Sequence, residues 1–235
     1  IDTVLPCAAV ADADVFAELL RDLISKSRTI LENHPVNVAR RKLGKYAANC
    51  IWPWSPGYRP AMAPLKEMVP INKGVVISAV DLVFGIGIYA GLATIKVDGA
   101  TGLYDTNYEG KLQAALKALG DNDTDFVFLH IEASDEAGHE GDAQLKIKTI
   151  ENLDRMIVGP LAESVACMPE PVRIAILPDH PTPCSIRTHT SDPVPFLIYD
   201  QDIEPDQTAV FSEKEAAKGV YGELFGDRFI KIFIT

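Results

Sequence analysis

The sequence predicts an α/β protein whose three-layer core is built on a mostly parallel sheet. Beyond residue 70, short apolar segments alternate with stretches of helical periodicity. The segments are rich in β-branched and aromatic residues and mostly lack polar alternation, which is typical of strands buried on both faces. They span residues 74–78, 92–97, 125–131, 172–177 and 194–199. With 235 residues, 47% hydrophobic and 23% charged, the chain has the composition of an ordinary globular protein.

The first part of the chain predicts a separate domain. Residues 12–33 have the three-four apolar spacing of an amphipathic helix, with Asp12 as its cap and Pro35 as its stop. Residues 51–70 are rich in proline and contain two tryptophans, which indicates an irregular connector. We therefore expect one domain over residues 1–70 and a second over residues 71–235.

Two further elements are expected in the second domain. Apolar residues of 141–158 fall on one face of a helix, which suits a crossover between strands. The last apolar segment, "RFIKIFI" at 228–234, predicts an edge strand.

The net charge and the cysteine pattern indicate which binding partners and which cellular compartment to expect. The net charge of −11 argues against binding to nucleic acid or to an anionic membrane surface. No apolar run approaches the roughly 20 residues that cross a bilayer. The four cysteines, Cys7, Cys50, Cys167 and Cys184, form no CxxC pair, which favours a reducing cytoplasm over a disulfide scaffold or a zinc ribbon.

Metal-ligating residue types lie at the ends of three of the predicted strands. Asp135 and His139 lie in "EASDEAGH", Asp179 and His180 follow the next strand in "PDHPTP", and His189 precedes the last. Ligands of α/β proteins bind at the carboxyl edge of the sheet, where these segments meet. Carboxylate and imidazole together suit Mn²⁺, Zn²⁺ or Fe²⁺. Asp135 alone could equally be a helix cap, but three such segments together predict a metal site.

These motifs carry a resemblance to a known family. "DEAGH", "PDHPTP" and "HTSDPVP", in this order, resemble the metal motifs of the alkaline phosphatase superfamily, and more closely those of archaeal-type cofactor-independent phosphoglycerate mutases. "HPVN", "AANCIWPW", "VVISAVDLVFGIG" and "GATGLYDTNYEGK" resemble further blocks of that family, so that the likeness covers most of residues 30–200.

The resemblance implies a phosphoryl-transfer enzyme with two divalent ions, Mn²⁺ or Zn²⁺, and a small phosphorylated substrate. In such mutases a metal-bound serine takes the phosphoryl group from 3-phosphoglycerate and returns it to the 2-hydroxyl. By position, Asp135, His139 and His189 would hold the first ion, and Asp179 and His180 would contribute to the second.

Three further residues are candidates for substrate binding. Arg40 matches an arginine of the family's inserted domain and could bind a carboxylate or a phosphate. It could equally be a solvated charge at a helix end. Asp105 and Tyr108 are candidates for the lining of the cleft.

The sequence also departs from the family pattern. The family's first Asp-Gly segment and its nucleophilic serine have no match, since Ser78, Ser134 and Ser191 lie in other blocks. We therefore expect a C-terminal portion of a longer protein, in which residues 1–70 are part of an inserted substrate domain. Such a portion would hold at most one ion tightly and would be inactive alone.

A second departure concerns the substrate. Phe84 stands where the family usually carries a lysine that faces the phosphoryl group. A homoserine kinase-like or another phosphate-ester activity is therefore an alternative to the mutase. For this chain alone, a non-catalytic metal-binding domain is the other alternative.

Overall fold

The computed structural model describes residues 13–53, 60–121 and 123–234. The chain forms two compact units, Ile1–Pro60 and Ala61–Thr235. The expected cap of the first helix, Asp12, lies outside the described residues.

Among its described residues, the first unit contains two helices, α1 (Ala13–Glu32) and α2 (Pro35–Lys42). Pro35 does more than end the predicted helix, because it also begins α2. In the first turn of a helix the backbone N–H has no partner within the helix, so a proline, which has no N–H, loses no hydrogen bond there. His34 caps α2 by accepting from the Val36 N–H at 3.3 Å. Buried Asn37 joins the two helices to the following segment, since its amide donates to the Leu31 carbonyl at 2.7 Å and to the Ala48 carbonyl at 2.8 Å.

The boundary between the units lies at Pro60, whereas we predicted residue 70. Residues 61–70 belong to the second unit because they pack into it. The Leu65 N–H donates to the Ala90 carbonyl at 2.8 Å, and Val69 and Ile71 are buried. The predicted irregular connector also contains one helical turn, α3 (Leu65–Met68).

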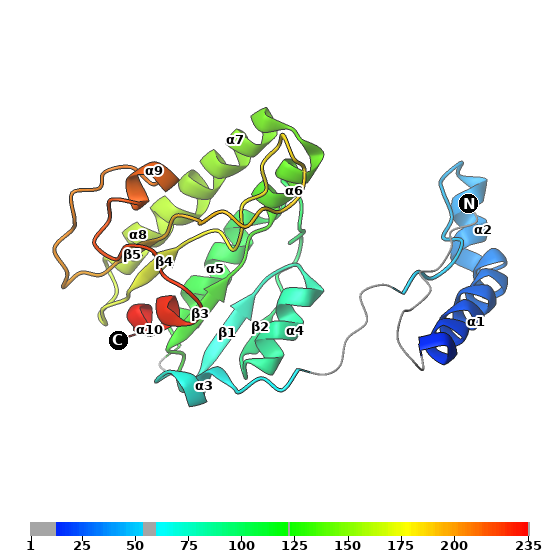
Figure 1. Cartoon of the computed structure of the whole chain (residues 1–235), viewed down its shortest axis with the longest axis horizontal. Helices are drawn as coiled ribbons and strands as arrows, with labels where there is room; N and C mark the ends of the chain where they lie inside the picture. The colour runs from blue at the N-terminus through cyan, green and yellow to red at the C-terminus, as the bar shows by residue number, and fades with distance from the viewer. Residues whose placement is uncertain (1–12, 54–59, 122, 235) are drawn as a thin grey trace. The chain divides into compact units, whose positions relative to one another are not determined.

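A three-stranded parallel sheet organises the second unit (Figure 1). Its strands are β1 (Gly74–Ile77), β2 (Ala93–Ile95) and β3 (Phe126–Leu129), in the order β2-β1-β3. β1 is buried along its whole length, as predicted. β2 is largely exposed and β3 only partly buried, so the expectation of burial on both faces is wrong for these two strands.

The strand order explains where a site can form. The chain moves from β1 to β2 on one side and then crosses back to β3 on the other. Reversal of this kind creates a switch point at the carboxyl ends of β1 and β3, where α/β proteins bind ligands.

The remaining two strands differ from the predicted arrangement. β4 (Ile174–Ile176) and β5 (Leu197–Tyr199) pair antiparallel in a second sheet. No helix lies between them, and neighbouring strands can run parallel only when a crossover returns the chain to the same end. Among the described strands, the parallel arrangement is therefore restricted to β1, β2 and β3.

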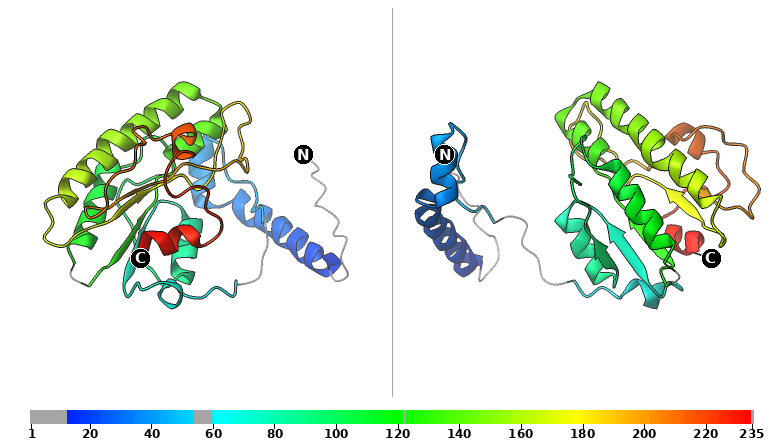
Figure 2. Two further views of the ribbon diagram at one scale, coloured as in Figure 1. Left: turned by 60° about the vertical axis from the view of Figure 1, so that its left-hand side comes forward. Right: turned by 180° about the vertical axis from the view of Figure 1, so that it is seen from behind.

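Helices of the second unit connect and cover the strands (Figure 2). Besides α3, they are α4 (Asp81–Tyr89), α5 (Tyr108–Leu119), α6 (Ala133–Glu140), α7 (Ala143–Leu153), η1 (Asp154–Val158), α8 (Gly159–Val165), α9 (Glu213–Ala216) and α10 (Arg228–Ile234). α5 contacts β1 and β3 on one side and η1 and α8 on the other. Its buried Tyr108 and Leu112 form a core cluster with Ala133 and Ile157.

The helix predicted over 141–158 is interrupted. α7 ends at Leu153 and the chain continues as one π-helical segment, η1, before α8. Pro160 lies in the first turn of α8 and has no N–H to donate to the preceding turn, which favours a change of hydrogen-bond pattern just before it.

The C-terminal segment is a helix, α10, and the predicted edge strand at 228–234 is wrong. Phe229 and Phe233 are four residues apart and stack on one helical face at 6.2 Å, and Phe229 meets Phe196 edge-on. The Arg173 guanidinium donates to the Phe233 carbonyl at 2.8 Å. These contacts need the 3.6-residue period, which the short apolar segment did not distinguish from a strand.

Within the described ranges, no helix combines the length and the apolar character that crossing a membrane requires.

Candidate metal centre

Two of the predicted ligands lie on the helix that follows β3. β3 ends at Leu129 and α6 starts at Ala133, so that Asp135 falls in its first turn. His139 follows one turn later on the same face. The Asp135 Oδ2 and His139 Nε2 atoms are 3.3 Å apart.

The loop after β4 brings the remaining ligands to α6 (Figure 1). The Thr190 N–H donates to the Pro181 carbonyl at 3.1 Å and closes the loop between His180 and His189. Their ring centroids are 3.6 Å apart, and the ring planes are tilted by 30° to each other.

The polar atoms of three side chains converge on one point. His139 Nε2 lies 3.1 Å from His189 Nε2, and His189 Nε2 lies 3.5 Å from Asp135 Oδ1. Ligands at about 2.1 Å from one divalent ion are separated by about 3.0–3.4 Å in octahedral or tetrahedral geometry. Two imidazole nitrogens that face each other need either a shared proton or a cation between them. The donor set therefore fits a divalent metal ion.

His180 and Asp179 lie beside this group. His180 Nδ1 is 3.9 Å from Asp135 Oδ1, and one ligand atom each of Asp135, His180 and His189 falls within 4.8 Å of the others. The other ring nitrogen of His180, Nε2, is 3.4 Å from Asp179 Oδ2. His180 thus faces two carboxylates with its two different ring nitrogens.

Comparison with known proteins assigns the chain that carries these residues to a family. The model of the Metalloenzyme superfamily matches residues 45–228, well over half of the chain. The chain belongs to the Metalloenzyme superfamily. The matched region contains all five candidate ligands, Asp135, His139, Asp179, His180 and His189.

Individual proteins are similar to this chain over nearly its whole length. The 2,3-bisphosphoglycerate-independent phosphoglycerate mutase of Methanosarcina mazei is 49% identical over 218 residues, which cover 92% of this chain and 54% of that protein. The structure of the PH0037 protein from Pyrococcus horikoshii has a TM-score of 0.82 at 38% identity, and the match covers 95% of this chain and 57% of that one.

A second solved structure, the cofactor-independent phosphoglycerate mutase from Thermoplasma acidophilum, has a TM-score of 0.52 at 26% identity, with 88% of this chain and 48% of that one covered. These similarities confirm the predicted resemblance and the α/β, alkaline-phosphatase-like fold class. The chain spans about half the length of the curated relatives it matches.

The electrostatics of this superfamily member favour a cation at the site. Besides the candidate ligands, Glu132 and Glu136 add negative charge around Asp135. Burial, followed by repulsion from Glu136, Asp135 and Asp179, raises the pKa of Glu132. A divalent ion would neutralise this accumulation of carboxylates.

A buried polar layer lies behind the candidate ligands at the ends of β1 and β3. Lys111 is 1% exposed and donates to the His130 carbonyl at 3.3 Å, and burial lowers the pKa of its ammonium. His130 Nδ1 lies 3.1 Å from the Ser78 hydroxyl, and burial lowers the pKa of this imidazole as well. Ser78 is 1% exposed and accepts from the Val80 N–H, so its hydroxyl has structural partners and no path to a substrate.

Sequence reasoning missed two residues that contact the candidate ligands. Thr182, 3% exposed, donates from its hydroxyl to Asp135 and lies 3.3 Å from His180 Nδ1. It belongs to the quoted "PDHPTP" block, which was the available signal. Arg187 accepts with its carbonyl from the His139 ring, and no feature of the sequence indicated this contact.

The three candidate substrate residues have different surroundings. Arg40 lies in the first unit, where its Nε donates to the Tyr46 carbonyl at 2.6 Å. Asp105 is exposed and accepts from the Thr101 hydroxyl at 3.3 Å. Tyr108 is 4% exposed within the core cluster, and its hydroxyl donates to the Tyr104 carbonyl at 3.3 Å. Since a buried and bonded Tyr108 offers nothing to a ligand, we propose no substrate contact for it, whereas Arg40 and Asp105 stay predictions.

Phe84, which replaces the expected lysine, is buried in α4 with 7% exposure. Lys96 places its ammonium 6.0 Å from the centroid of the Phe84 ring. A lysine at position 84 of this chain would have to bury its charge, so Phe84→Lys would not be a simple restoration of a substrate contact.

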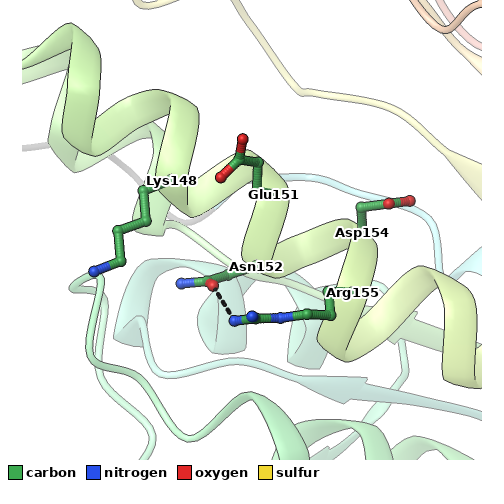
Figure 3. Close-up of a pocket in the computed structure, with 5 residues that line it drawn as sticks. All are labelled: Lys148, Glu151, Asn152, Asp154 and Arg155. Atoms are coloured by element: carbon green, nitrogen blue, oxygen red, sulfur yellow. Dashed lines mark hydrogen bonds between the residues drawn. The ribbon is translucent and has the colours of Figure 1, made fainter.

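A surface hollow is formed by side chains that follow α6 along the chain (Figure 3). It is lined by Lys148, Glu151, Asn152, Asp154 and Arg155 of α7 and η1. The Arg155 guanidinium donates to the Asn152 amide oxygen at 2.9 Å, so that part of the lining is already paired (Figure 3). No candidate ligand lines this hollow.

Proposed function

We propose that the chain is the metal-binding part of a phosphoglycerate mutase that interconverts 3-phosphoglycerate and 2-phosphoglycerate. The observation that carries the proposal is the convergence of Asp135, His139 and His189, with Asp179 and His180 beside them, in a chain whose relatives bear that name. The substrate class is a small phosphorylated molecule, and a cytoplasmic location stays a prediction from the cysteine pattern.

The candidate ligands divide into two groups. Asp135, His139 and His189 would hold one divalent ion, Mn²⁺ or Zn²⁺. Asp179 and the Nε2 atom of His180 would contribute to a second, whose remaining ligands we expect outside this chain. We therefore expect at most one tightly bound ion here. When bound, such ions lower the pKa of a nucleophilic hydroxyl and neutralise charge on the phosphoryl group.

Neighbouring residues of this chain would orient the metal ligands and attract the ion. Thr182 donates its hydroxyl to Asp135 Oδ1 and so fixes the carboxylate plane. The carbonyl of Arg187 holds the His139 ring. Glu132 and Glu136 add a negative field that attracts cations.

The test is turnover of 3-phosphoglycerate by the complete protein with Mn²⁺. We expect conversion to 2-phosphoglycerate and a loss of more than about 100-fold in His139→Ala, because a lost ligand costs at least as much as a lost partner of a ligand. His34→Asn is a matched control, since an asparagine can also cap α2.

The buried Phe84, in place of a lysine, is the observation that favours a second candidate function. A parallel assay with homoserine and ATP therefore belongs to the same experiment. Phosphorylation of homoserine without mutase turnover would reject the mutase in favour of the kinase-like alternative. Absence of both activities in a protein that binds Mn²⁺ would favour a non-catalytic metal-binding domain.

A further inference from the structure

Arg187 combines two unusual features at the edge of the candidate metal centre. Among the described residues it is the one non-glycine residue with a positive φ, at 59°. This left-handed conformation costs an ordinary side chain roughly 1–2 kcal/mol. Its own N–H donates to the Pro183 carbonyl at 2.8 Å, as does the N–H of Ile186 at 3.0 Å, so a tight turn holds it there.

The turn aims the main-chain carbonyl of Arg187 at a candidate ligand. The carbonyl oxygen lies 3.0 Å from His139 Nδ1. Because a carbonyl can only accept, the proton of this hydrogen bond must lie on Nδ1. In a neutral ring this leaves the lone pair on Nε2, the atom that faces Asp135 Oδ2 and His189 Nε2.

The side chain of Arg187 lies against the end of α6. A Cβ atom on Gly141 would lie 2.4 Å from the Arg187 Nε, so the guanidinium lies directly against this glycine. Gly141 ends α6, the helix that carries Asp135 and His139, with a φ of 75°. A cation is favoured at the C-terminal end of a helix, where carbonyl oxygens are left unpaired.

We propose that Arg187 is the positioning residue of His139. Its left-handed backbone directs the carbonyl that fixes the Nδ1–H tautomer, while its guanidinium lies against the end of α6 without being required for this role. The inference rests on the proposed metal site, but it concerns the chain's own atoms and applies to the metal-free protein. It also explains why a strained backbone is kept in an exposed loop, where other residues have no such constraint.

The first measurement needs no variant. Nitrogen-15 NMR of the imidazoles in the metal-free protein at pH 8 should show His139 as the Nδ1–H tautomer. Detection of the Nε2–H tautomer in the wild-type protein would overturn the proposal, whatever the metal affinity.

Two substitutions then separate the backbone from the side chain. Arg187→Val disfavours a positive φ because the residue is β-branched, and it should displace the carbonyl. We expect loss of the Nδ1–H tautomer and a 10–100-fold weaker affinity for Mn²⁺ by calorimetry, in the range measured for groups that orient metal ligands. Arg187→Gly permits the conformation and keeps the carbonyl, so it should retain the tautomer and most of the affinity.

The outcomes distinguish this inference from the proposed function. If the wild-type protein does not bind Mn²⁺, the metal site is rejected. The tautomer of His139 would still test whether Arg187 positions that ring. If the valine variant folds, by circular dichroism, and keeps both tautomer and affinity, Arg187 does not position His139. Loss of the tautomer in the glycine variant would reject the role of the carbonyl.

Discussion

His130 lies behind the candidate ligands as a neutral member of the buried polar layer. Its ring faces the Ser78 hydroxyl, and its carbonyl accepts from Lys111, so both ends of the residue are engaged. Burial lowers the pKa of the ring, and Asp179 only partly opposes this effect. The imidazole therefore contributes to the shape of the switch point in its uncharged form.

We expect this imidazole to make stability depend on pH. The pKa of His130 in the folded protein lies below the unfolded value of about 6.5, so the unfolded chain binds the proton first as the pH falls. The free energy of unfolding should therefore decline below about pH 6.5, and in the His130→Asn variant it should decline less. Calorimetric unfolding of both metal-free proteins at pH 5, 6, 7 and 8 measures these two pH dependences. The contributions of the other histidines are the same in both proteins and cancel when the two are subtracted. Equal slopes in the two proteins would contradict it.

At the scale of an element, α4 shows how a helix is fitted to a strand. It follows β1 directly and contains two glycines, Gly85 and Gly87, within nine residues. Gly87 is buried, and a Cβ atom there would lie 2.5 Å from the Val76 Cγ1 in the centre of β1. Nothing lies within 4 Å of a Cβ atom at Gly85. The close approach of α4 to the sheet thus depends on one of the two glycines.

The two glycines predict opposite effects of the same substitution. Gly87→Ala should lower the free energy of unfolding by about 1–3 kcal/mol, because the buried, β-branched Val76 cannot yield without moving the strand. Gly85→Ala should raise it by up to about 1 kcal/mol, since alanine is the better helix former. Chemical denaturation of both variants measures the difference. Equal effects of the two substitutions would show that α4 does not press on Val76 as described.

At the scale of the whole molecule, the chain consists of two units, and all five candidate ligands belong to one of them, Ala61–Thr235. An ion that binds the folded form stabilises the unit that contains its site, and it leaves the other unit unchanged where the two unfold independently. Metal binding therefore provides a test that separates the units without cutting the chain.

We expect Mn²⁺ to stabilise one unit selectively. At a concentration of about 100 times its Kd, it should add about 2.7 kcal/mol to the unfolding free energy of Ala61–Thr235 and nothing to that of Ile1–Pro60. Hydrogen exchange with and without Mn²⁺ resolves the two units, and Asp135→Asn should abolish the protection. Protection of α1 and α2 equal to that of α5 and α6, or protection that persists in the variant, would contradict the assignment.

The sequence alone determined the features that depend on local pattern. The strands of residues 74–78, 92–97 and 125–131 were predictable because short apolar segments rich in β-branched and aromatic residues favour the extended conformation. The candidate ligands were predictable for a related reason, since ligands gather at the carboxyl ends of strands. The resemblance to phosphoglycerate mutases followed from the same motifs, because metal-binding loops tolerate few residue types.

Only the tertiary structure decided what depends on neighbours distant in sequence. The apolar segment 228–234 is a helix because Phe196 packs on its aromatic face and Arg173 donates to its Phe233 carbonyl. Pairing of β4 with β5 is antiparallel because no crossover helix separates them. The carbonyl of Arg187 reaches His139 across 48 residues of sequence. Main-chain groups are the same in every residue, so a carbonyl that orients a ligand leaves no trace in the side-chain pattern, and only the folded loop shows it.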